Sequence, residues 1–265
     1  GCGQSACWGY PMYFTASNSL IEGNEIYHFP SYGIHMYKNG ISGPPFPSNN
    51  IVRNNVIHDF STTYWPTAVA GALGPGDPRG CGILPTSGVG NRVYNNLVYN
   101  GSGGICTTGG GSDNLIYNNT VYKMTGGGIN IANQNATVVN NIVYDIGGSD
   151  TPIVQYGGSS GTFSKNLCDR AGLGCDIIGD PKFTNTAVGN FTLQSGSPAI
   201  NAGSILSLFT TDFSGAIRVG NYDIGAFEFG GTAIPPPATL PPPPTPIPPP
   251  PSSTGWTFCA SEFSQ

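Results

Sequence analysis

The sequence predicts an all-β fold, a right-handed parallel β-helix whose coils are about 22–25 residues long. Three observations support this prediction: an Asn-containing segment recurs, a Gly-Ile segment alternates with it, and two columns of apolar residues keep the same spacing. Internal repeats of this length are typical of solenoids. Charged residues make up 9% and hydrophobic residues 38% of the chain, a balance that supports a buried core and argues against disorder.

The Asn-containing segments are EGNEIYHF, RNNVIHDF, YNNLVYN, YNNTVYKM, VNNIVYDI and the decayed SKNLCDR. The asparagines that align them are Asn24, Asn55, Asn96, Asn119, Asn141 and Asn166, at intervals of 31, 41, 23, 22 and 25 residues. Because asparagine tolerates unusual backbone angles, we expect this column to form a sharp bend between strands. Each side-chain amide can also bond the equivalent amide one coil away.

Two apolar columns keep register with these asparagines. Two positions after the aligned residue lie Ile26, Ile57, Val98, Val121, Val143 and Cys168. Three positions before it lie Ile21, Val52, Val93, Ile116, Val138 and Phe163. Stacked at the strand spacing of about 4.8 Å, each column would form an apolar ladder inside the solenoid.

The Gly-Ile segments GIHMY, GILP, GICT, GINIA and the weaker PIVQY predict a further strand in each coil. The Leu columns of a leucine-rich repeat are absent, and helical repeats tolerate few glycines, whereas this chain has 40. The two long intervals indicate loop insertions near Lys38–Asn49 and Ser61–Gly80. Insertions in solenoids commonly lie on the binding face.

The C-terminal part contains two different motifs, NFTLQSGSPAINAGS at 190–204 and DFSGAIRVGNYDIGAFEF at 212–229. With the repeats, these motifs resemble the bacterial secreted right-handed parallel β-helix proteins of the pectate-lyase-like superfamily, over roughly residues 8–229. The resemblance implies a β-helix over residues 1–229, with coils in 1–170 and a segment at 171–229 that closes the helix. Closure would protect strand edges from end-to-end addition.

Residues 230–254 are expected to form a Pro-rich linker, since 12 of the 17 residues in 235–251 are proline. Such a run favours an extended polyproline II spacer. Residues 255–265 resemble the start of a Cys-containing module that is cut short, which would place the partner of Cys259 beyond Gln265. An alternative is that the proline-rich arm packs on a neighbouring subunit and supports self-assembly.

The spacing of four of the seven cysteines suits small disulfide loops: Cys2 with Cys7, and Cys168 with Cys175. Free thiols are the alternative. The sequence assigns no partner to Cys81, Cys106 or Cys259, and it has no CxxC or Cys/His spacing of the kind that binds zinc.

Candidate catalytic residues gather in the N-terminal coils: His28, His35, Lys38, Arg53, His58 and Asp59. A histidine or lysine would act as general base and an arginine would neutralise a uronate carboxylate. His28 and Asp59 occupy one column, so a hydrogen-bonded pair on adjacent coils is expected. The alternative is that these residues are solvated turn residues with no catalytic role.

The resemblance implies polysaccharide lyase chemistry, in which Lys or Arg takes a proton and Ca²⁺ often masks the uronate charge. Calcium needs converging carboxylates, and only Glu25, Asp59 and Asp77 are candidates here. No acidic cluster is evident, so the sequence predicts no metal site. Ca²⁺ stays a candidate cofactor through the resemblance alone. A closely paired carboxylate motif of the glycosidase kind is also missing.

An aromatic column follows the apolar one and is expected to face outward. Its tyrosines, with Trp65 of the second insertion, are the candidate sugar-stacking residues: Tyr27, Tyr99, Tyr122 and Tyr144. The alternative is an aromatic ladder that only stabilises the sheet.

Three functional hypotheses follow: a polysaccharide lyase or hydrolase, a non-catalytic glycan-binding or adhesive module, and a structural subunit of an extracellular assembly. The predicted partner is a polysaccharide or cell-surface glycan, and the predicted location is outside the cell. With 9 Lys plus Arg and a net charge of -5, nucleic acid is not an expected partner. No apolar run is long enough to predict a membrane span.

Overall fold

The structure is a computed structural model that describes residues 11–29, 31–37, 46–60, 80–108, 110–147 and 151–231. The chain divides into two units, Gly1–Ile234 and Pro235–Gln265, and the second lies outside the described residues. Several predictions concern residues that also lie outside them: the linker beyond residue 231, the module at 255–265, Cys2, Cys7, Lys38, Trp65, Asp77 and Cys259.

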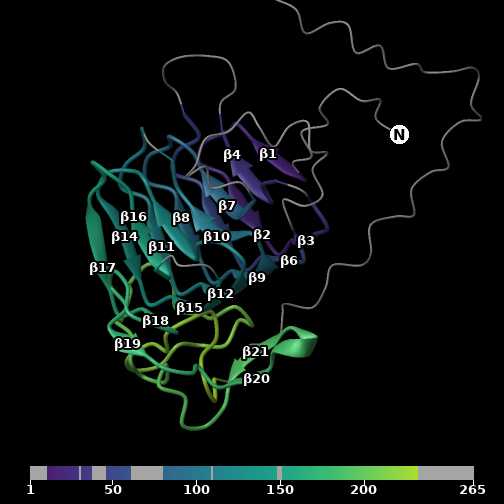
Figure 1. The fold of residues 1–265 in the computed structure, drawn as a ribbon, viewed down its shortest axis with the longest axis vertical. Coiled ribbons are helices and arrows are strands. Elements are labelled where there is room, and N and C mark those ends of the chain that lie inside the picture. Colours follow the sequence, from purple (N-terminus) through teal and green to yellow (C-terminus); the bar gives the residue numbers. More distant parts are fainter. Residues whose placement is uncertain are drawn as a thin grey trace, which may run out of the picture. The chain divides into compact units, whose positions relative to one another are not determined.

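Three parallel sheets wrap the chain into a β-helix, as predicted (Figure 1). The first sheet contains β1 (Met12–Phe14), β4 (Ile34–Met36), β7 (Cys81–Pro85), β10 (Gly103–Cys106), β13 (Ile129–Ile131) and β16 (Ile153–Gln155). The second contains β2 (Leu20–Glu22), β5 (Ile51–Arg53), β8 (Arg92–Tyr94), β11 (Leu115–Tyr117), β14 (Ala136–Val139) and β17 (Gly161–Ser164). The third contains β3 (Glu25–Tyr27), β6 (Val56–His58), β9 (Leu97–Gly101), β12 (Thr120–Met124), β15 (Ile142–Ile146), β18 (Leu167–Cys168) and β19 (Ile177–Ile178).

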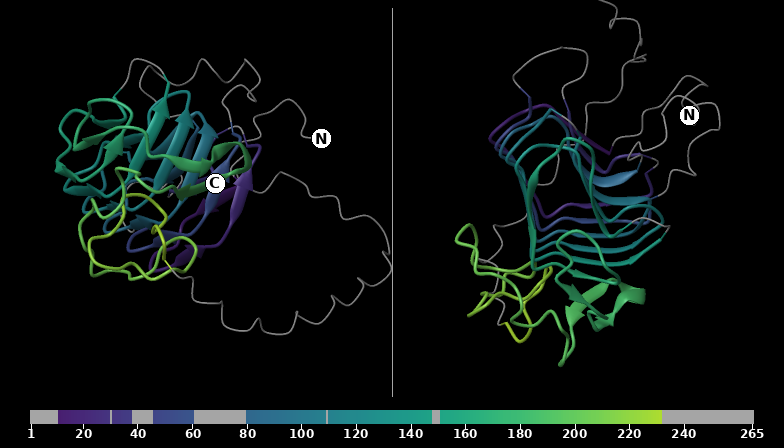
Figure 2. Two further views of the ribbon diagram at one scale, coloured as in Figure 1. Left: turned by 90° about the horizontal axis from the view of Figure 1, so that it is seen from below. Right: turned by 60° about the vertical axis from the view of Figure 1, so that its left-hand side comes forward.

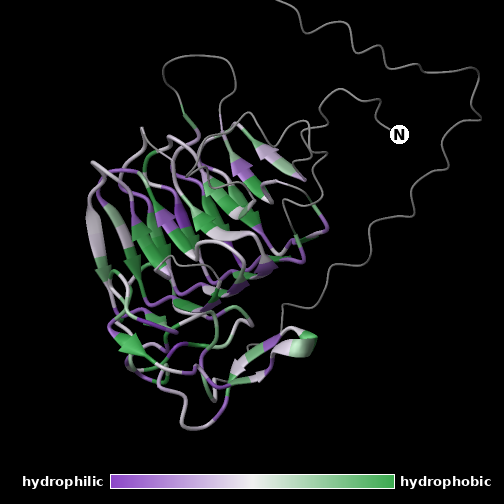
Figure 3. Cartoon of the chain, viewed as in Figure 1, coloured by the Kyte–Doolittle hydropathy of each residue, from purple (hydrophilic) through white to green (hydrophobic). Residues whose placement is uncertain are grey.

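Both predicted apolar columns lie inside the solenoid, with the expected register. The column from Ile26 to Cys168 runs through the third sheet and the column from Ile21 to Phe163 through the second. All their members are buried except Phe163, which packs against the core from the last coil. Figure 3 shows the hydrophobic residues concentrated on the stacked strands.

The Gly-Ile segments supply the third inward column, in which Ile34, Ile83, Ile105 and Ile129 stack on one another. A Cβ on any of the glycines before these isoleucines would clash, with the backbone of the next coil at Gly33, Gly104 and Gly128 and with the side chain of Val98 at Gly82. A Cβ at Gly33 would lie 2.6 Å from the carbonyl oxygen of Gly82, closer than real contacts allow. The recurrent Gly-Ile pair therefore indicates that the strands of the first sheet are tightly stacked.

The predicted asparagine ladder is present at the corner between the second and third sheets. The backbone N–H and Nδ2 of Asn96 both donate to Oδ1 of Asn119, at 3.1 and 3.0 Å. Those of Asn119 donate in the same way to Asn141, both at 3.0 Å. Every rung from Asn55 onward is fully buried. The ladder therefore satisfies backbone donors that the bend would otherwise leave unpaired.

The unusual backbone angles, however, belong mainly to the residue before each rung. Asn54, Asn95, Asn118 and Asn140 have φ values of 53, 51, 47 and 60°. Asparagine adopts this left-handed conformation more readily than other residues with a Cβ. The two asparagines of each pair thus have different roles. The first adopts the left-handed conformation at the bend, and the second forms hydrogen bonds to the next coil.

A second, shorter asparagine ladder at the other edge of the second sheet was not predicted. Backbone N–H groups of Ser19, Asn50 and Asn91 donate to Oδ1 of Asn50, Asn91 and Asn114, at 3.0, 3.0 and 2.9 Å. Each of these asparagines stands five positions before a rung of the first ladder. That spacing was visible in the sequence and could have revealed it.

The two ends of the first ladder differ. At the last rung, the backbone N–H and Nδ2 of Asn166 both donate to the carbonyl oxygen of Gly174, at 3.2 and 3.1 Å. Gly174 therefore takes the place of a further asparagine. At the first rung, Asn24 donates to Asn55, and its own Oδ1 accepts no hydrogen bond from the described residues. The described chain closes the ladder at one end only.

Most of the segment predicted to close the helix lies along its flank (Figures 1 and 2), while its first residues lie on the last coil, where Gly174 accepts from Asn166 and β19 pairs with β18. Side-chain amides at the corner of three successive coils hold it: Asn95 donates to the Thr211 carbonyl, Asn118 to that of Asp223 and Asn140 to that of Ser204. The hairpin of β20 (Phe183–Asn185) and β21 (Asn190–Leu193), joined by η2 (Thr186–Val188), also belongs to this segment. The segment buries the outward apolar residues of the third sheet, such as Leu97 and Ile142.

Two disulfides lie within the described residues. The predicted bond between Cys168 and Cys175 is confirmed, and it closes the loop that carries Gly174. Cys81, which was left without a partner, bonds Cys106, the residue 25 positions later. Because 25 residues is one coil, the repeat length itself could have suggested that these two cysteines lie on neighbouring coils.

Replacing both Cys168 and Cys175 with alanine is expected to lower the free energy of unfolding by about 2.5 kcal/mol. The bond closes a loop with a sequence separation of 7, and its removal returns conformational entropy to the unfolded chain. Denaturant unfolding of the parent and the variant measures the difference. A variant that unfolds at the parent's midpoint with the same slope would contradict this prediction.

Candidate functional site

The candidate catalytic residues that the structure describes lie on the outer surfaces of three different sheets, and Lys38 lies outside the described residues. His35 is on β4 of the first sheet, Arg53 on β5 of the second and His58 on β6 of the third. His28 and Asp59 follow the third-sheet strands β3 and β6. The fold therefore brings His28, His58 and Asp59 together but separates them from His35 and Arg53.

His35 is enclosed by tyrosine rings. Its ring centroid lies 5.3 Å from that of Tyr13, 4.7 Å from Tyr32 and 5.4 Å from Tyr37, and the residue is only 6% exposed. Burial lowers the pKa of His35 to about 4, because the apolar surroundings disfavour the charged imidazolium. His35 is therefore neutral near pH 7 and shielded from a substrate.

The guanidinium of Arg53 is already engaged. It lies 2.7 Å from a carboxylate oxygen of Glu22 and donates to the hydroxyl of Tyr94 at 3.1 Å. All three residues stand in one outward row of the second sheet. Arg53 therefore links three coils, and its charge is balanced within the row.

His58 is held between two carboxylates. Its Nδ1 lies 2.7 Å from Oδ2 of Asp59 and its Nε2 lies 3.3 Å from Oε1 of Glu25. Each ring nitrogen of His58 therefore has a carboxylate oxygen within reach, one from the adjacent residue and one from the preceding coil.

Asp59 pairs with a different histidine from the one predicted. Its contact with His28 is between backbones, where the His28 N–H donates to the Asp59 carbonyl at 3.1 Å, while its carboxylate binds His58 and Asn100. Burial tends to raise the pKa of Asp59, but the hydrogen bonds from His58 and Asn100, with the nearby histidine charges, lower it overall. The carboxylate is therefore stabilised in its ionised form.

The aromatic column faces outward on the third sheet, as predicted, but it does not form a flat strip. The ring of His58 stacks between those of Tyr27 and Tyr99, with centroids 5.3 and 5.0 Å apart and interplanar angles of 22 and 7°. The faces of these rings are thus turned toward one another along the solenoid. A sugar beside the middle of the stack would meet ring edges.

The C-terminal segment covers the rest of the column. Phe191 lies 4.8 Å from Tyr99 and 5.4 Å from Tyr122, and Phe183 lies 5.9 Å from Tyr122. Tyr144 is half-buried against the same segment. Tyr99, Tyr122 and Tyr144 are therefore half-buried beneath this segment and offer less surface than an open strip, and their sugar-stacking role stays a prediction. Tyr27, which is 51% exposed, remains open.

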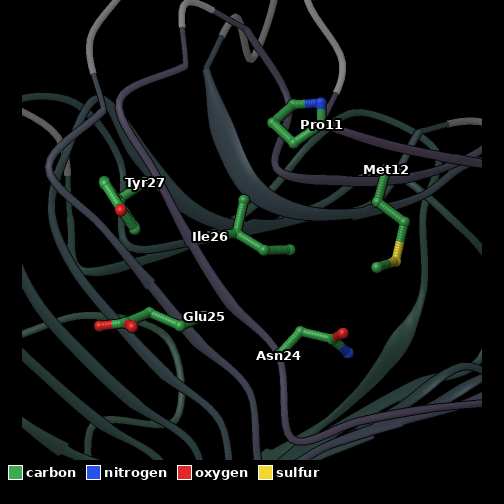
Figure 4. A pocket seen from close by; sticks show the side chains of 6 residues that line it. All are labelled: Pro11, Met12, Asn24, Glu25, Ile26 and Tyr27. Atoms are coloured by element: carbon green, nitrogen blue, oxygen red, sulfur yellow. The ribbon is translucent and has the colours of Figure 1, made fainter. Parts of the chain in front are cut away.

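Tyr27 lines an open pocket of about 340 Å³ at the N-terminal end of the described coils. Figure 4 shows its lining side chains: Pro11, Met12, Asn24, Glu25, Ile26 and Tyr27. The apolar residues form one part of the lining, and the side-chain oxygens of Asn24 and Glu25 provide polar groups. Oδ1 of Asn24 and Oε2 of Glu25 accept no hydrogen bond from the described residues. The sequence offered no signal for this pocket beyond the column positions of its residues.

The described part of the chain contains no group of three or more His, Cys, Asp or Glu residues arranged to hold a metal ion. Glu25 and Asp59 bind opposite nitrogens of His58, and Asp77 lies outside the described residues. Calcium therefore stays an untested prediction. Among the described residues we also find no helix with the length and apolar character needed to cross a bilayer.

Comparison with known proteins supports the geometry. Residues 76–192 match a family model described as the right-handed beta helix region. The chain is a right-handed parallel β-helix. This is the fold that the resemblance to the pectate-lyase-like superfamily implied.

Among solved structures, this β-helix is similar to the crystal structure of pectate lyase Pel9A. The likeness covers 83% of this chain and 67% of that one, with 16% identity and a TM-score of 0.40. No curated protein matches the β-helix in sequence.

Proposed function

We propose that this β-helix is an extracellular, carbohydrate-binding module that holds a glycan at the pocket beside Tyr27 without cleaving it. The observation that carries the proposal is the meeting of three features at one place. Tyr27 is the open ring of the aromatic stack, and Asn24 and Glu25 present oxygen acceptors beside it that no described residue uses. Sugars combine apolar C–H surfaces with hydroxyl donors, so they can use both kinds of group.

The positions of the charged residues favour glycan binding over lyase chemistry. A lyase acting on a uronate needs a base and a cation beside one carboxylate. Among the described residues, Arg53 is paired with Glu22 on another sheet and His35 is enclosed by tyrosines. The charged residue in the described lining of the pocket is Glu25, and the neighbouring imidazole of His58 is already bonded to Glu25 and Asp59. Hydrolysis by Glu25 and Asp59 is also disfavoured, since both carboxylates are bonded to His58.

An extracellular location is supported by the two disulfides, which form and persist in oxidising compartments. The structural-subunit hypothesis depends on the proline-rich arm, which lies outside the described residues. It remains an alternative, and it predicts a concentration-dependent assembly that disappears when residues 232–265 are removed.

Replacing Tyr27 with alanine is expected to weaken glycan binding about tenfold, a change of about 1.4 kcal/mol, because it removes the open ring. The native chain is first screened on a glycan array, and isothermal titration then measures the affinity for the best ligand. Tyr27→Phe keeps the ring and should bind like the native chain. Tyr156→Ala, at a 40% exposed tyrosine on the last coil of the first sheet, is the matched control. Equal affinities for native and Tyr27→Ala proteins would refute the assignment of the site.

A further inference from the structure

We infer that the pocket at Asn24, Glu25 and Tyr27 takes the terminal unit of an uncharged glycan and disfavours polyuronates. This inference rests on the proposed function and specifies the ligand of the same site. It follows from the polarity of the asparagine ladder, the direction of the aromatic stack and the local charge.

The ladder has an unused acceptor at the pocket. In every later rung, Oδ1 accepts hydrogen bonds from the rung before it, as Asn55 does from Asn24 at 3.0 and 2.8 Å. Among the described residues Asn24 is the first rung, and its Oδ1 accepts no such hydrogen bond from them. At the opposite end, Gly174 already satisfies Asn166. Oδ1 of Asn24 can therefore accept a hydrogen bond from a sugar hydroxyl in the pocket.

The aromatic stack limits contact to one sugar unit. The faces of His58 are covered by Tyr27 and Tyr99, and Tyr99 is further covered by Phe191. Among the described residues Tyr27 is the last ring of the stack, and it alone of these rings lines the pocket. A polysaccharide lying along the column would meet ring edges and then the C-terminal segment. A chain end entering the pocket can instead contact Tyr27, Asn24 and Glu25 together.

The volume of the pocket agrees with a terminal unit. At about 340 Å³ it lies near the lower limit for small-molecule sites, which extend from about 300 to 1,000 Å³. Its lining combines apolar side chains, Met12 and Ile26, with two oxygen acceptors. This combination suits the C–H surface and hydroxyls of one sugar ring.

The local charge disfavours a uronate. Glu25 and Asp59 share the single ring of His58, and the other nearby titratable groups are Tyr27, Tyr99 and His28, whose ring lies perpendicular to that of Tyr27. The pKa of Tyr99 is raised by burial first, and then by the charges of Asp59 and Glu25. A uronate carboxylate in the pocket would face Glu25, and the described lining residues include no Lys or Arg. Like charges at short range repel each other.

The test compares linear hexasaccharides of glucose, mannose, galactose and xylose with a hexamer of galacturonic acid, by isothermal titration on the full chain. The best neutral hexamer is expected to bind at least tenfold more tightly than the uronate hexamer. A longer polymer of the preferred sugar should show the same affinity when its concentration is counted in chain ends. An affinity that instead follows the total sugar concentration would overturn the chain-end assignment.

Glu25→Gln tests the origin of the selectivity, because it removes the charge and keeps a carbonyl acceptor. The ratio of neutral to uronate affinity is expected to fall about tenfold. Asp113→Asn makes the same charge change at an exposed turn between the first and second sheets, and it should leave the ratio as in the native chain.

The two proposals fail in different ways. Tighter binding of the uronate hexamer that Tyr27→Ala removes would keep the proposed function and overturn the inference about the ligand. An unchanged ratio in Glu25→Gln would overturn the role of its charge. No binding of any oligomer would overturn both proposals.

Discussion

Replacing Arg218 with methionine is expected to lower the free energy of unfolding by about 3–5 kcal/mol, the cost of breaking a buried ion pair from one side. The Arg218 side chain is fully buried, 3.2 Å from a carboxylate oxygen of Glu228. It also donates to Oδ1 of Asn95 at 3.0 Å and to the carbonyls of Gly225 and Ala226 at 3.0 and 3.2 Å. Methionine retains much of the volume but leaves Glu228 charged and unpaired.

The consequence should extend to the attachment of the C-terminal segment. Arg218 packs over the rings of Phe209 and Tyr222, and its bond to Asn95 joins the segment to a coil 123 residues earlier. Burial raises the pKa of Glu228, which indicates how poorly an ionised carboxylate is solvated there without its partner. We therefore expect faster hydrogen exchange on the outward face of the third sheet in the variant.

Denaturant unfolding and hydrogen exchange measure these effects, with Arg92→Met as the control. Arg92 is an exposed arginine on β8, and its replacement should change stability by less than about 0.5 kcal/mol. If both variants lose the same stability, the buried network does not hold the segment in place.

Replacing Asn119 with alanine is expected to lower the free energy of unfolding by about 2–5 kcal/mol, because each buried polar group left unpaired costs about 1–3 kcal/mol. Oδ1 of Asn119 accepts from the backbone N–H of Asn96, and its Nδ2 donates to the Val93 carbonyl at 2.9 Å. Both partners lie in the core and have no access to water.

Asn24→Ala provides the matched control within the same ladder. Asn24 is half-buried, and its Oδ1 accepts no hydrogen bond from the described residues, so its removal leaves none of their buried donors unpaired. The expected loss is below about 1 kcal/mol. Calorimetric or denaturant unfolding of the two variants, measured side by side, would contradict the ladder's role in stability if the losses were equal.

The fold could be predicted to the level of individual columns because stacking makes it periodic. Ile57, Val98 and Val121 have the same environment one coil apart, so the same residue type recurs at a fixed distance along the chain. Asn96 and Asn119 recur for the same reason. The second ladder and the disulfide between Cys81 and Cys106 also follow this period, and their spacing was present in the sequence.

The candidate site was predicted only in part. The column positions correctly placed Tyr27, His58 and Tyr99 in one outward row. They could not show that the rings stack on one another, because the ring orientation depends on side-chain torsions. They also could not show that Phe183 and Phe191 cover the column, since these residues come from a segment with no repeat.

The sequence alone thus determined the solenoid, the residues that fill it and the amides that link its coils, because each of these depends on neighbours one repeat away. Tertiary structure decided which outward residues remain available. Arg218, Asp223 and Phe191 reach coils far earlier in the chain, and no period relates them to their partners. The open end at Asn24 and Tyr27 remains uncovered by the described residues because the C-terminal segment packs on the flank of the later coils.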